Sequence, residues 1–360
     1  MEGIAWILLK IVLGTVAVLA FGITAGLFFK GIDRKLSARM QGRIGPPIRQ
    51  PFRDVVKLFT KENIVPDNSI PWVFNLAPLI GLVATITILL YIPIGGLDDP
   101  IASTGYGGFG DLILVLYLLI IPSLAMVIGG FSSGSPYATV GAQREMATMI
   151  AYEFPLAIII ISFAWLLGNS SFGLGAEQAF SFVVIAGNPI WGSVGILGLI
   201  GAIILLLAIM IVTPAELSKI PFDSPEAETE IAGGLLAEYS GRNLGMFYLT
   251  DAVKTVVMAS IVVALFFPWN LSDLLSVQNP EWLAYILNIL FFLFKVFLVI
   301  LFSVTLIRVA IARLKIDQIV GTYWLWITLL ALVGLICIMW DMQAQSMGLY
   351  TPILQSLGLG

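Results

Sequence analysis

The chain contains no histidine and a single cysteine among its 360 residues. Haem iron is usually held by His, Met, Cys or Tyr, and iron–sulfur clusters need several Cys or Cys with His. A bis-histidine haem cytochrome and a cluster-bearing subunit are therefore excluded, and zinc chemistry is disfavoured for the same reason. Cys337 lies in an apolar stretch, where cysteine is usually a small packing residue. If this chain moves protons, then carboxylates, lysine, arginine, tyrosine and water must carry them.

Charge is also scarce, at 11% of residues, whereas a soluble domain has about 25%. Hydrophobic residues make up 59% of the chain and the mean hydropathy is +1.00. This composition indicates an integral membrane protein, because apolar stretches of about 20 residues are typical of spanning helices. We expect an all-α fold in a single transmembrane domain, residues 1–360, that crosses the membrane eight times. The expected spans are about 4–30, 72–95, 111–130, 146–168, 192–213, 246–267, 285–307 and 323–341.

The positions of lysine and arginine predict the orientation of these spans. Of the 18 basic residues, all but Lys10, Lys254 and Lys295 lie in the first, third, fifth and seventh connections. Basic residues gather on the cytoplasmic side of membrane proteins. The odd-numbered connections are therefore predicted to be cytoplasmic, with both termini on the outer side. No internal repeat is visible in the sequence.

The fifth connection, about 214–245, concentrates the acidic residues. They are Glu216, Asp223, Glu226, Glu228, Glu230 and Glu238. Glu226 and Glu230 are four apart and would share one face of a helix, and Asp223 could cap that helix after Pro221. A solvated acidic loop is the alternative, but the apolar IAGGLLA run favours a helix that packs. Crowded carboxylates repel, so some keep their protons near neutral pH, as a proton relay requires.

Ionisable residues also fall inside the expected spans, where unpaired charge is costly. Glu145 and Glu153 lie at the start of the fourth span. Asp251 and Lys254 are three apart in the sixth, and an ion pair between them is either structural or part of a path. Lys295 lies near the middle of the seventh. Together these residues predict a polar path into the membrane.

The first connection, about 31–71, is basic. An amphipathic helix is expected from Pro51 to Glu62 behind a rigid Gly45-Pro46-Pro47 turn. Its charge favours a docking surface for an acidic soluble partner as well as the usual cytoplasmic bias. The basic residues expected there include Arg34, Arg39, Arg43, Arg49, Arg53 and Lys57. Nucleic acid is not an expected partner, since no binding motif accompanies the charge. Neither a Ser-His-Asp nor a phosphate-loop pattern occurs.

Three segments carry a resemblance to a known family: ARMQGRIGPPIRQPFRDVVKLFTKE at 38–62, YEFPL at 152–156 and PFDSPEAETEIAGGLLAEYSG at 221–241. They resemble the H subunit of respiratory complex I, the ND-one family, which includes the matching subunit of energy-converting membrane-bound [NiFe] hydrogenases. The resemblance covers most of the chain. It implies a multi-pass subunit of the prokaryotic plasma membrane that anchors a soluble redox arm and couples it to H⁺ or Na⁺ pumping.

The resemblance also implies roles for residues and partners. Glu226, Glu228, Glu230 and Glu238 would line the entrance of a glutamate-lined path, with Glu153 deeper. Arg43, Gln50, Asp54 and Lys57 would belong to the docking loop. Expected partners are hydrogenase-like large and cluster-bearing small soluble subunits, antiporter-like and small membrane subunits, and membrane lipid. No cofactor is expected in this chain; a NiFe centre and iron–sulfur clusters would lie in the partner subunits.

Two features bear on the branch of the family. The compact GPPIRQP turn and the Arg-Glu pair of REMATMIAYE resemble the hydrogenase branch or its sulfur-reducing relatives. A quinone-site subunit of a complex I-like dehydrogenase is the alternative. A stand-alone secondary transporter would carry internal repeats, which are absent. A passive anchor is disfavoured by Glu153 and Lys295 within the spans.

Overall fold

The computed structural model describes residues 2–94, 111–169, 178–275 and 281–347 of the chain, and within them the protein is all-α. The longer helices are α1 (Glu2–Met40), α2 (Gln50–Thr60), α3 (Pro71–Leu89), α4 (Asp111–Ser132), α5 (Pro136–Asn169), α8 (Ile196–Glu216), α10 (Gly241–Phe266), α12 (Glu281–Val299) and α15 (Thr328–Ser346). The shorter pieces are η2 (Gln178–Phe180), α6 (Phe182–Gly187), α7 (Ile190–Ser193), η3 (Ser224–Glu226), α9 (Glu228–Ile231), η4 (Gly234–Leu236), α11 (Leu271–Leu274), η5 (Ile300–Thr305), α13 (Leu306–Ala310), α14 (Ile316–Gly321) and η6 (Thr322–Ile327).

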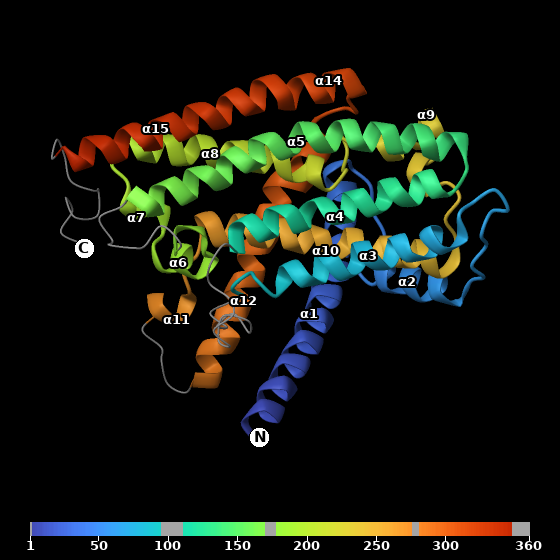
Figure 1. The fold of residues 1–360 in the computed structure, drawn as a ribbon, viewed down its shortest axis with the longest axis horizontal. Helices are drawn as coiled ribbons and strands as arrows, with labels where there is room; N and C mark the ends of the chain where they lie inside the picture. Colours follow the sequence, from blue (N-terminus) through green and yellow to red (C-terminus); the bar gives the residue numbers. More distant parts are fainter. Residues whose placement is uncertain (1, 95–110, 170–177, 276–280, 348–360) are drawn as a thin grey trace.

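Eight helices of the described residues are long and apolar enough to cross a membrane, which confirms the number of spans expected from the sequence. Figure 1 shows α3, α4, α5, α8 and α15 running side by side, while α1 and α12 leave this group at a steep angle. Helix α10 lies in the middle. Its most apolar window is 94% buried inside the protein, whereas that of α1 is 28% buried.

The sequence of α10 explains its central place. Its second half, VVMASIVVALF, is apolar on every side, as expected for a helix enclosed by others, and these residues are all buried. Helix α10 packs mainly against α3, α1, α2 and α12. Any charged residue on α10 is therefore held inside the protein, and this applies to Asp251 and Lys254.

Two helix boundaries differ from the sequence prediction by ten residues. Helix α1 continues to Met40 instead of ending near residue 30, because the basic segment is rich in Lys, Arg, Leu and Ala, which favour helix. It stops just before Gly42, whose φ of +73° suits a glycine that ends a helix. Helix α5 begins at Pro136, ten residues earlier than expected, so Glu145 lies well inside it.

The acidic connection does not form the expected single helix. It is broken into η3, α9 and η4 because Ala227 is extended and Ala232 has a φ of +52°. The prediction that Glu226 and Glu230 share one helix face is therefore wrong. The predicted cap is also wrong, since Asp223 makes no capping hydrogen bond.

Pro214 interrupts the last turn of α8. Proline has no N–H, so the carbonyl of Met210, four residues earlier, loses its usual helical partner. Ser303, in the π-helical segment η5, donates a hydrogen bond to that carbonyl at 2.7 Å. Tyr323, in the second π-helical segment η6, donates to the adjacent carbonyl of Ile211 at 2.8 Å. Both π segments thus hold the proline turn that precedes Glu216.

Replacing Ser303 with alanine should leave the Met210 carbonyl buried without a donor, at a cost of about 1–3 kcal/mol in the free energy of unfolding. Chemical unfolding of the purified protein in detergent micelles measures this. Ser162→Ala is the matched control, because the fully buried Ser162 hydroxyl donates to Ile158 of its own helix. Equal losses in the two variants would contradict the role given to Ser303.

Candidate functional site

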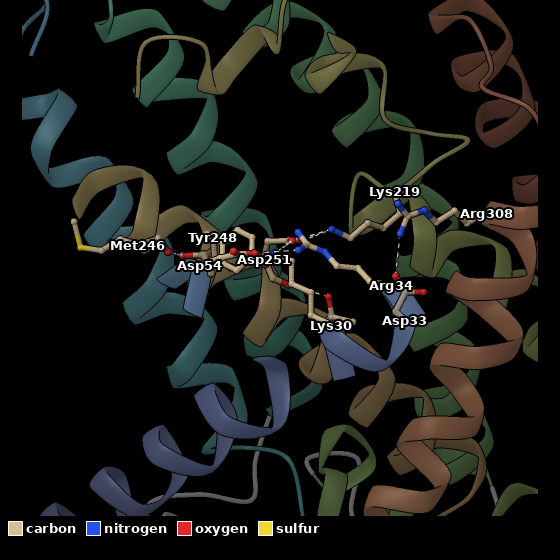
Figure 2. Close-up of polar contacts among 11 residues, drawn as sticks. Lys30, Asp33, Arg34, Asp54, Lys219, Met246, Tyr248, Asp251 and Arg308 are labelled. Carbon is tan, nitrogen blue, oxygen red and sulfur yellow. Dashed lines mark hydrogen bonds and ion pairs between the residues drawn. The ribbon is translucent and has the colours of Figure 1, made fainter. Parts of the chain in front are cut away.

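Two lysines share one carboxylate near the end of the bundle that carries the acidic connection. Lys30 of α1 lies 2.6 Å from Oδ2 of Asp251, and Lys219 of the acidic connection lies 2.6 Å from Oδ1. Figure 2 shows these lysines approaching Asp251 from different elements. The ammonium of Lys30 also lies 3.4 Å from the centre of the Tyr248 ring, a favourable cation–π contact. This group carries one more positive charge than negative.

Asp251 lines a cavity of about 550 Å³ between α1, α10, α13 and the acidic connection. Further ion pairs form its walls. Asp33 pairs with Arg308 at 3.0 Å and accepts a hydrogen bond from Thr305 at 2.8 Å. Asp223 receives two hydrogen bonds from Arg313, at 2.6 and 2.8 Å. The cavity is thus lined by alternating acids and bases rather than by charge of one sign.

A second charged pair lies deeper. Lys254 of α10 and Glu216 of α8 are 2.8 Å apart, and their side chains are 3% and 2% exposed. Lys254 also donates to Ser123 of α4 at 2.8 Å, and Ser123 lies 3.2 Å from the hydroxyl of Tyr152 on α5. Four helices therefore meet in one hydrogen-bonded line. Such a line costs desolvation energy that an apolar core would avoid.

Two carboxylate oxygens beside this line have no partner among the described residues: Oε1 of Glu145 and Oε2 of Glu216. The other oxygen of Glu145 accepts a hydrogen bond from Ser218 at 3.4 Å. Glu153, about two turns further along α5, is partly buried. Buried acids with an unmatched oxygen are suited to taking up and releasing a proton or holding a cation.

The glutamates of the acidic connection separate into two groups. Glu226 faces the cavity, and burial raises its pKa, opposed by the charge of Lys219. Glu228 lines the cavity but is exposed, and Glu230 is exposed and pairs with Arg144 at 2.5 Å. Glu238 is exposed. Of these residues, Glu226 is therefore the one poised to change its protonation inside the protein.

The expected ion pair between Asp251 and Lys254 is wrong. The two residues point to different partners: Asp251 to Lys30 and Lys219, and Lys254 to Glu216. Lys295 lies apart from both groups. It donates hydrogen bonds to the carbonyls of Phe267 and Trp269, at 2.8 and 2.7 Å, at the carboxyl end of α10. A cation there complements the negative end of the helix dipole.

The expected docking residues lie on α1, α2 and the turn between them. Asp54 accepts hydrogen bonds from Arg34 at 3.2 Å and from Gln50 at 2.8 Å. Arg43 donates to Gln41. Arg39 lies at the end of α1, Arg49 directly precedes α2, and Arg53 and Lys57 lie on α2; all four are exposed. The predicted amphipathic helix is confirmed, because Phe52 and Val55 of α2 pack against the core beside α10.

The structure adds residues to the site that the sequence interpretation left out: Lys30, Asp33, Ser123, Tyr152, Lys219, Tyr248, Arg308 and Arg313. From the sequence alone, the lysines and arginines among them cannot be distinguished from the basic residues that gather in the loops of membrane proteins. For Ser123, the available signal was that a polar residue follows Pro122 within an otherwise apolar span. Within the described residues, no group of three or more His, Cys, Asp or Glu could hold a metal ion.

These features define a polytopic helical membrane protein with charged pairs inside its bundle. The profile of the family described as NADH dehydrogenase matches residues 13–339, and the chain belongs to that family. The H subunit of the NADH-quinone oxidoreductase of Dehalococcoides mccartyi is 30% identical, over 92% of this chain and 86% of its own length. That of Carboxydothermus hydrogenoformans is 32% identical, over 87% and 83%.

The fold is also similar to a solved structure. A chain of the membrane-bound sulfane sulfur reductase, an archaeal respiratory membrane complex, superposes with a TM-score of 0.77 at 30% sequence identity. The match covers 91% of this chain and 99% of that chain. The resemblance to the H-subunit family that the sequence motifs indicated is thereby confirmed.

Replacing Lys254 with methionine should strand the buried charge of Glu216, at a cost of about 3–5 kcal/mol in the free energy of unfolding. The double variant Glu216→Gln/Lys254→Met removes both charges and should be more stable than the single one. Chemical unfolding in detergent compares them. Lys295→Met is the control, because it strands no carboxylate. A double variant no more stable than Lys254→Met would show that the stranded charge of Glu216 is not the cause of the loss of stability.

The raised pKa of Glu226 predicts a pH dependence of stability. Between the ordinary value of 4.5 and the raised value, the folded protein binds a proton that the unfolded chain has released. This proton stabilises the fold at low pH, and its contribution falls as the pH rises through that window. Unfolding free energies of wild type and Glu226→Gln should therefore diverge with pH. Glu238→Gln, at an exposed site, should follow wild type; a parallel Glu226→Gln curve would refute the assignment.

Proposed function

We propose that this chain is the membrane anchor and ion-conducting subunit of a multisubunit, redox-driven ion pump of the complex I-like type. Electron transfer takes place in a soluble arm that docks on its basic first connection, and H⁺ or Na⁺ moves through its charged interior. The hydrogenase-type branch, or a sulfur-reducing relative, fits the compact GPPIRQP turn best. A NiFe centre or iron–sulfur clusters then belong to the partner subunits.

The observation that carries this proposal is the sequence of charged groups leading inward from the cavity. The outer group is Asp251 between Lys30 and Lys219, and the inner pair is Lys254 with Glu216. Asp251 and Lys254 lie three residues apart on α10, so one nearly rigid helix carries both. A purely structural core gains little from such pairs, since apolar residues of similar size would serve equally well.

Because two lysines share the Asp251 carboxylate, a change of charge near the cavity would change the positions of these lysines. Two lysines compete for Asp251, so an added negative charge near the cavity draws one of them away and strengthens the hold of the other. Such a change would favour an arrangement in which only one lysine holds Asp251 over the arrangement with both. The altered field at Glu226 and at the Glu216–Lys254 pair then changes their affinity for a proton or a cation.

The charge distribution supports an orientation for this chain. The cavity, the acidic connection and the basic first connection lie at one end of the bundle, with the residues that the positive-inside rule places in the cytoplasm. In this orientation both termini lie on the outer side of a prokaryotic plasma membrane. The antiporter-like and small membrane subunits would receive the ion from the inner pair.

A second candidate is a quinone-site subunit, because the similar H subunits belong to NADH-quinone oxidoreductases. An apolar groove of about 600 Å³ between α1 and α12 favours it. The groove is lined by Phe21, Phe28, Phe29, Phe52, Phe294 and Phe297, among others. Aromatic and aliphatic walls of this kind suit a lipid-soluble ring. Metal and quinone analysis of the purified complex separates the candidates.

Replacing Glu216 with glutamine should abolish ion translocation by the assembled complex while dye-linked electron transfer persists. Glutamine keeps the shape of the side chain but cannot carry the charge that Lys254 meets. Glu226→Gln should act in the same direction, because it faces the cavity. Ion uptake into inverted vesicles, measured per electron transferred to an artificial dye, tests both.

The matched control is Glu238→Gln, which removes an exposed glutamate from the same connection and should leave that ratio unchanged. Full translocation in the Glu216→Gln variant would rule out the conducting role and leave only the anchor.

A further inference from the structure

The π-helical segment η5 lies between α8 and α1 and donates a hydrogen bond to each of them. The hydroxyl of Ser303 donates to the carbonyl of Met210 in α8 at 2.7 Å. The hydroxyl of Thr305 donates to Oδ1 of Asp33 in α1 at 2.8 Å, a closer acceptor than the carbonyl of Ile300 at 3.4 Å. Residues two apart point to nearly opposite sides of a helix. Segment η5 therefore bridges α8 and α1.

The bond to α8 holds the turn from which Lys219 extends. Met210 lies about one turn before Pro214. The N–H of Lys219 donates to the carbonyl of Pro214 at 2.9 Å, so this lysine is tied to the end of α8. Tyr323 holds the same turn from η6. Between Pro214 and Lys219 lies Glu216, so one short stretch supplies a residue to each charged group.

The bond to α1 holds the turn from which Lys30 extends. Asp33 follows Lys30 by three residues, so the two side chains leave the same face of α1. Arg308 of α13, the helix that directly follows η5, pairs with the other oxygen of Asp33 at 3.0 Å (Figure 2). Thr305 and Arg308 thus fix the part of α1 from which Lys30 reaches Asp251.

The two turns that η5 holds carry the two lysines that share Asp251. Each ammonium lies 2.6 Å from a different oxygen of this carboxylate, so a change in the spacing of the turns would pull one lysine away. Ser303 and Thr305 are fully buried. A buried hydroxyl costs free energy unless it is hydrogen-bonded. The two hydroxyls are therefore explained by their partners on α8 and α1 and not by packing.

We propose that η5 holds Asp251 between its two lysines, with Ser303 positioning Lys219 and Thr305 positioning Lys30. Both hydroxyls act through other residues, so they are positioning residues. Loss of either hydroxyl frees one lysine and leaves the other on Asp251. The consequence for transport rests on the proposed function, because the shared carboxylate is the outer of its two charged groups.

The reactivity of each lysine shows whether it is held. The purified full-length chain in an uncharged detergent is treated with a limiting amount of acetic anhydride, and mass spectrometry measures the acetylation rate of each lysine. Ser303→Ala should raise the rate at Lys219, and Thr305→Val should raise the rate at Lys30. An increase of about tenfold corresponds to the loss of one charge-assisted hydrogen bond. Asp251→Asn should raise both rates.

Conservative variants and matched controls separate this role from general loosening. Ser303→Thr and Thr305→Ser keep a hydroxyl and should restore the wild-type rates. Ser162→Ala and Thr85→Val remove buried hydroxyls that donate to carbonyls of their own helices, and both should react like wild type. The exposed Lys57 serves as the reference amine in every variant.

Wild-type rates at both lysines in Ser303→Ala and Thr305→Val would overturn the proposal. An equal rise at both lysines in both variants would also overturn it, because two separate anchors predict two separate responses. If Ser303→Ala does not fold, Ser303→Cys gives the same comparison, since a thiol is a weak donor of similar size.

In the assembled complex, Ser303→Ala and Thr305→Val should lower the number of ions translocated per electron while dye-linked electron transfer persists. Ser303→Thr and Thr305→Ser should recover that ratio. Wild-type lysine rates in Ser303→Ala, with translocation lost in Glu216→Gln, would refute the positioning role alone. Altered lysine rates, with full translocation in Glu216→Gln, would refute the conducting role and leave the positioning role standing.

Discussion

The structure depends on the neutralisation of charge in a place where charge is expensive. Lys254 and Glu216 are almost fully buried between four spans, and each is tolerable only because the other is 2.8 Å away. The same constraint acts nearer the acidic connection, where Asp251 pairs with two lysines at once. Removing Lys254 or Glu216 leaves the other charge buried without its partner. The helices that carry these groups are therefore fixed relative to one another by electrostatics as much as by packing.

The irregular backbone lies where this constraint is strongest. Pro214 breaks the hydrogen-bond ladder one turn before the end of α8, and the π segments of two other helices contribute Ser303 and Tyr323 to the carbonyls around the break. π segments are rare and frequently mark functional sites. Their hydrogen bonds order the turn that carries Glu216, a residue whose side chain is almost fully buried. Regular helix elsewhere in the bundle carries the apolar packing.

Much of the fold could be predicted because the length of an apolar run directly indicates a membrane span. The eight spans, the amphipathic helix α2 and the acidic connection all follow from runs of residue types. The pairing within the site could not be predicted, because Lys30 and Asp251 are 221 positions apart and meet only through packing. Proximity along α10 suggested Lys254 for Asp251, but both side chains have closer partners on other helices. Likewise, the extended backbone at Ala227 separates Glu226 from Glu230, and their spacing of four gave no hint of it.

Helix α1 divides two environments, with phenylalanines toward the apolar groove and Lys30 toward the charged cavity. In the first half of this helix, the side chains of Val12, Leu13 and Val16 are each more than half exposed. The surrounding bilayer, and not the bundle, therefore sets the tilt of this half. From Val12 to Lys30 the helix extends over about 27 Å. A thinner or thicker membrane would change the tilt of this half and, through the continuous helix, the position of the Lys30 ammonium against Asp251, so the spacing of this ion pair depends on the lipids around the protein.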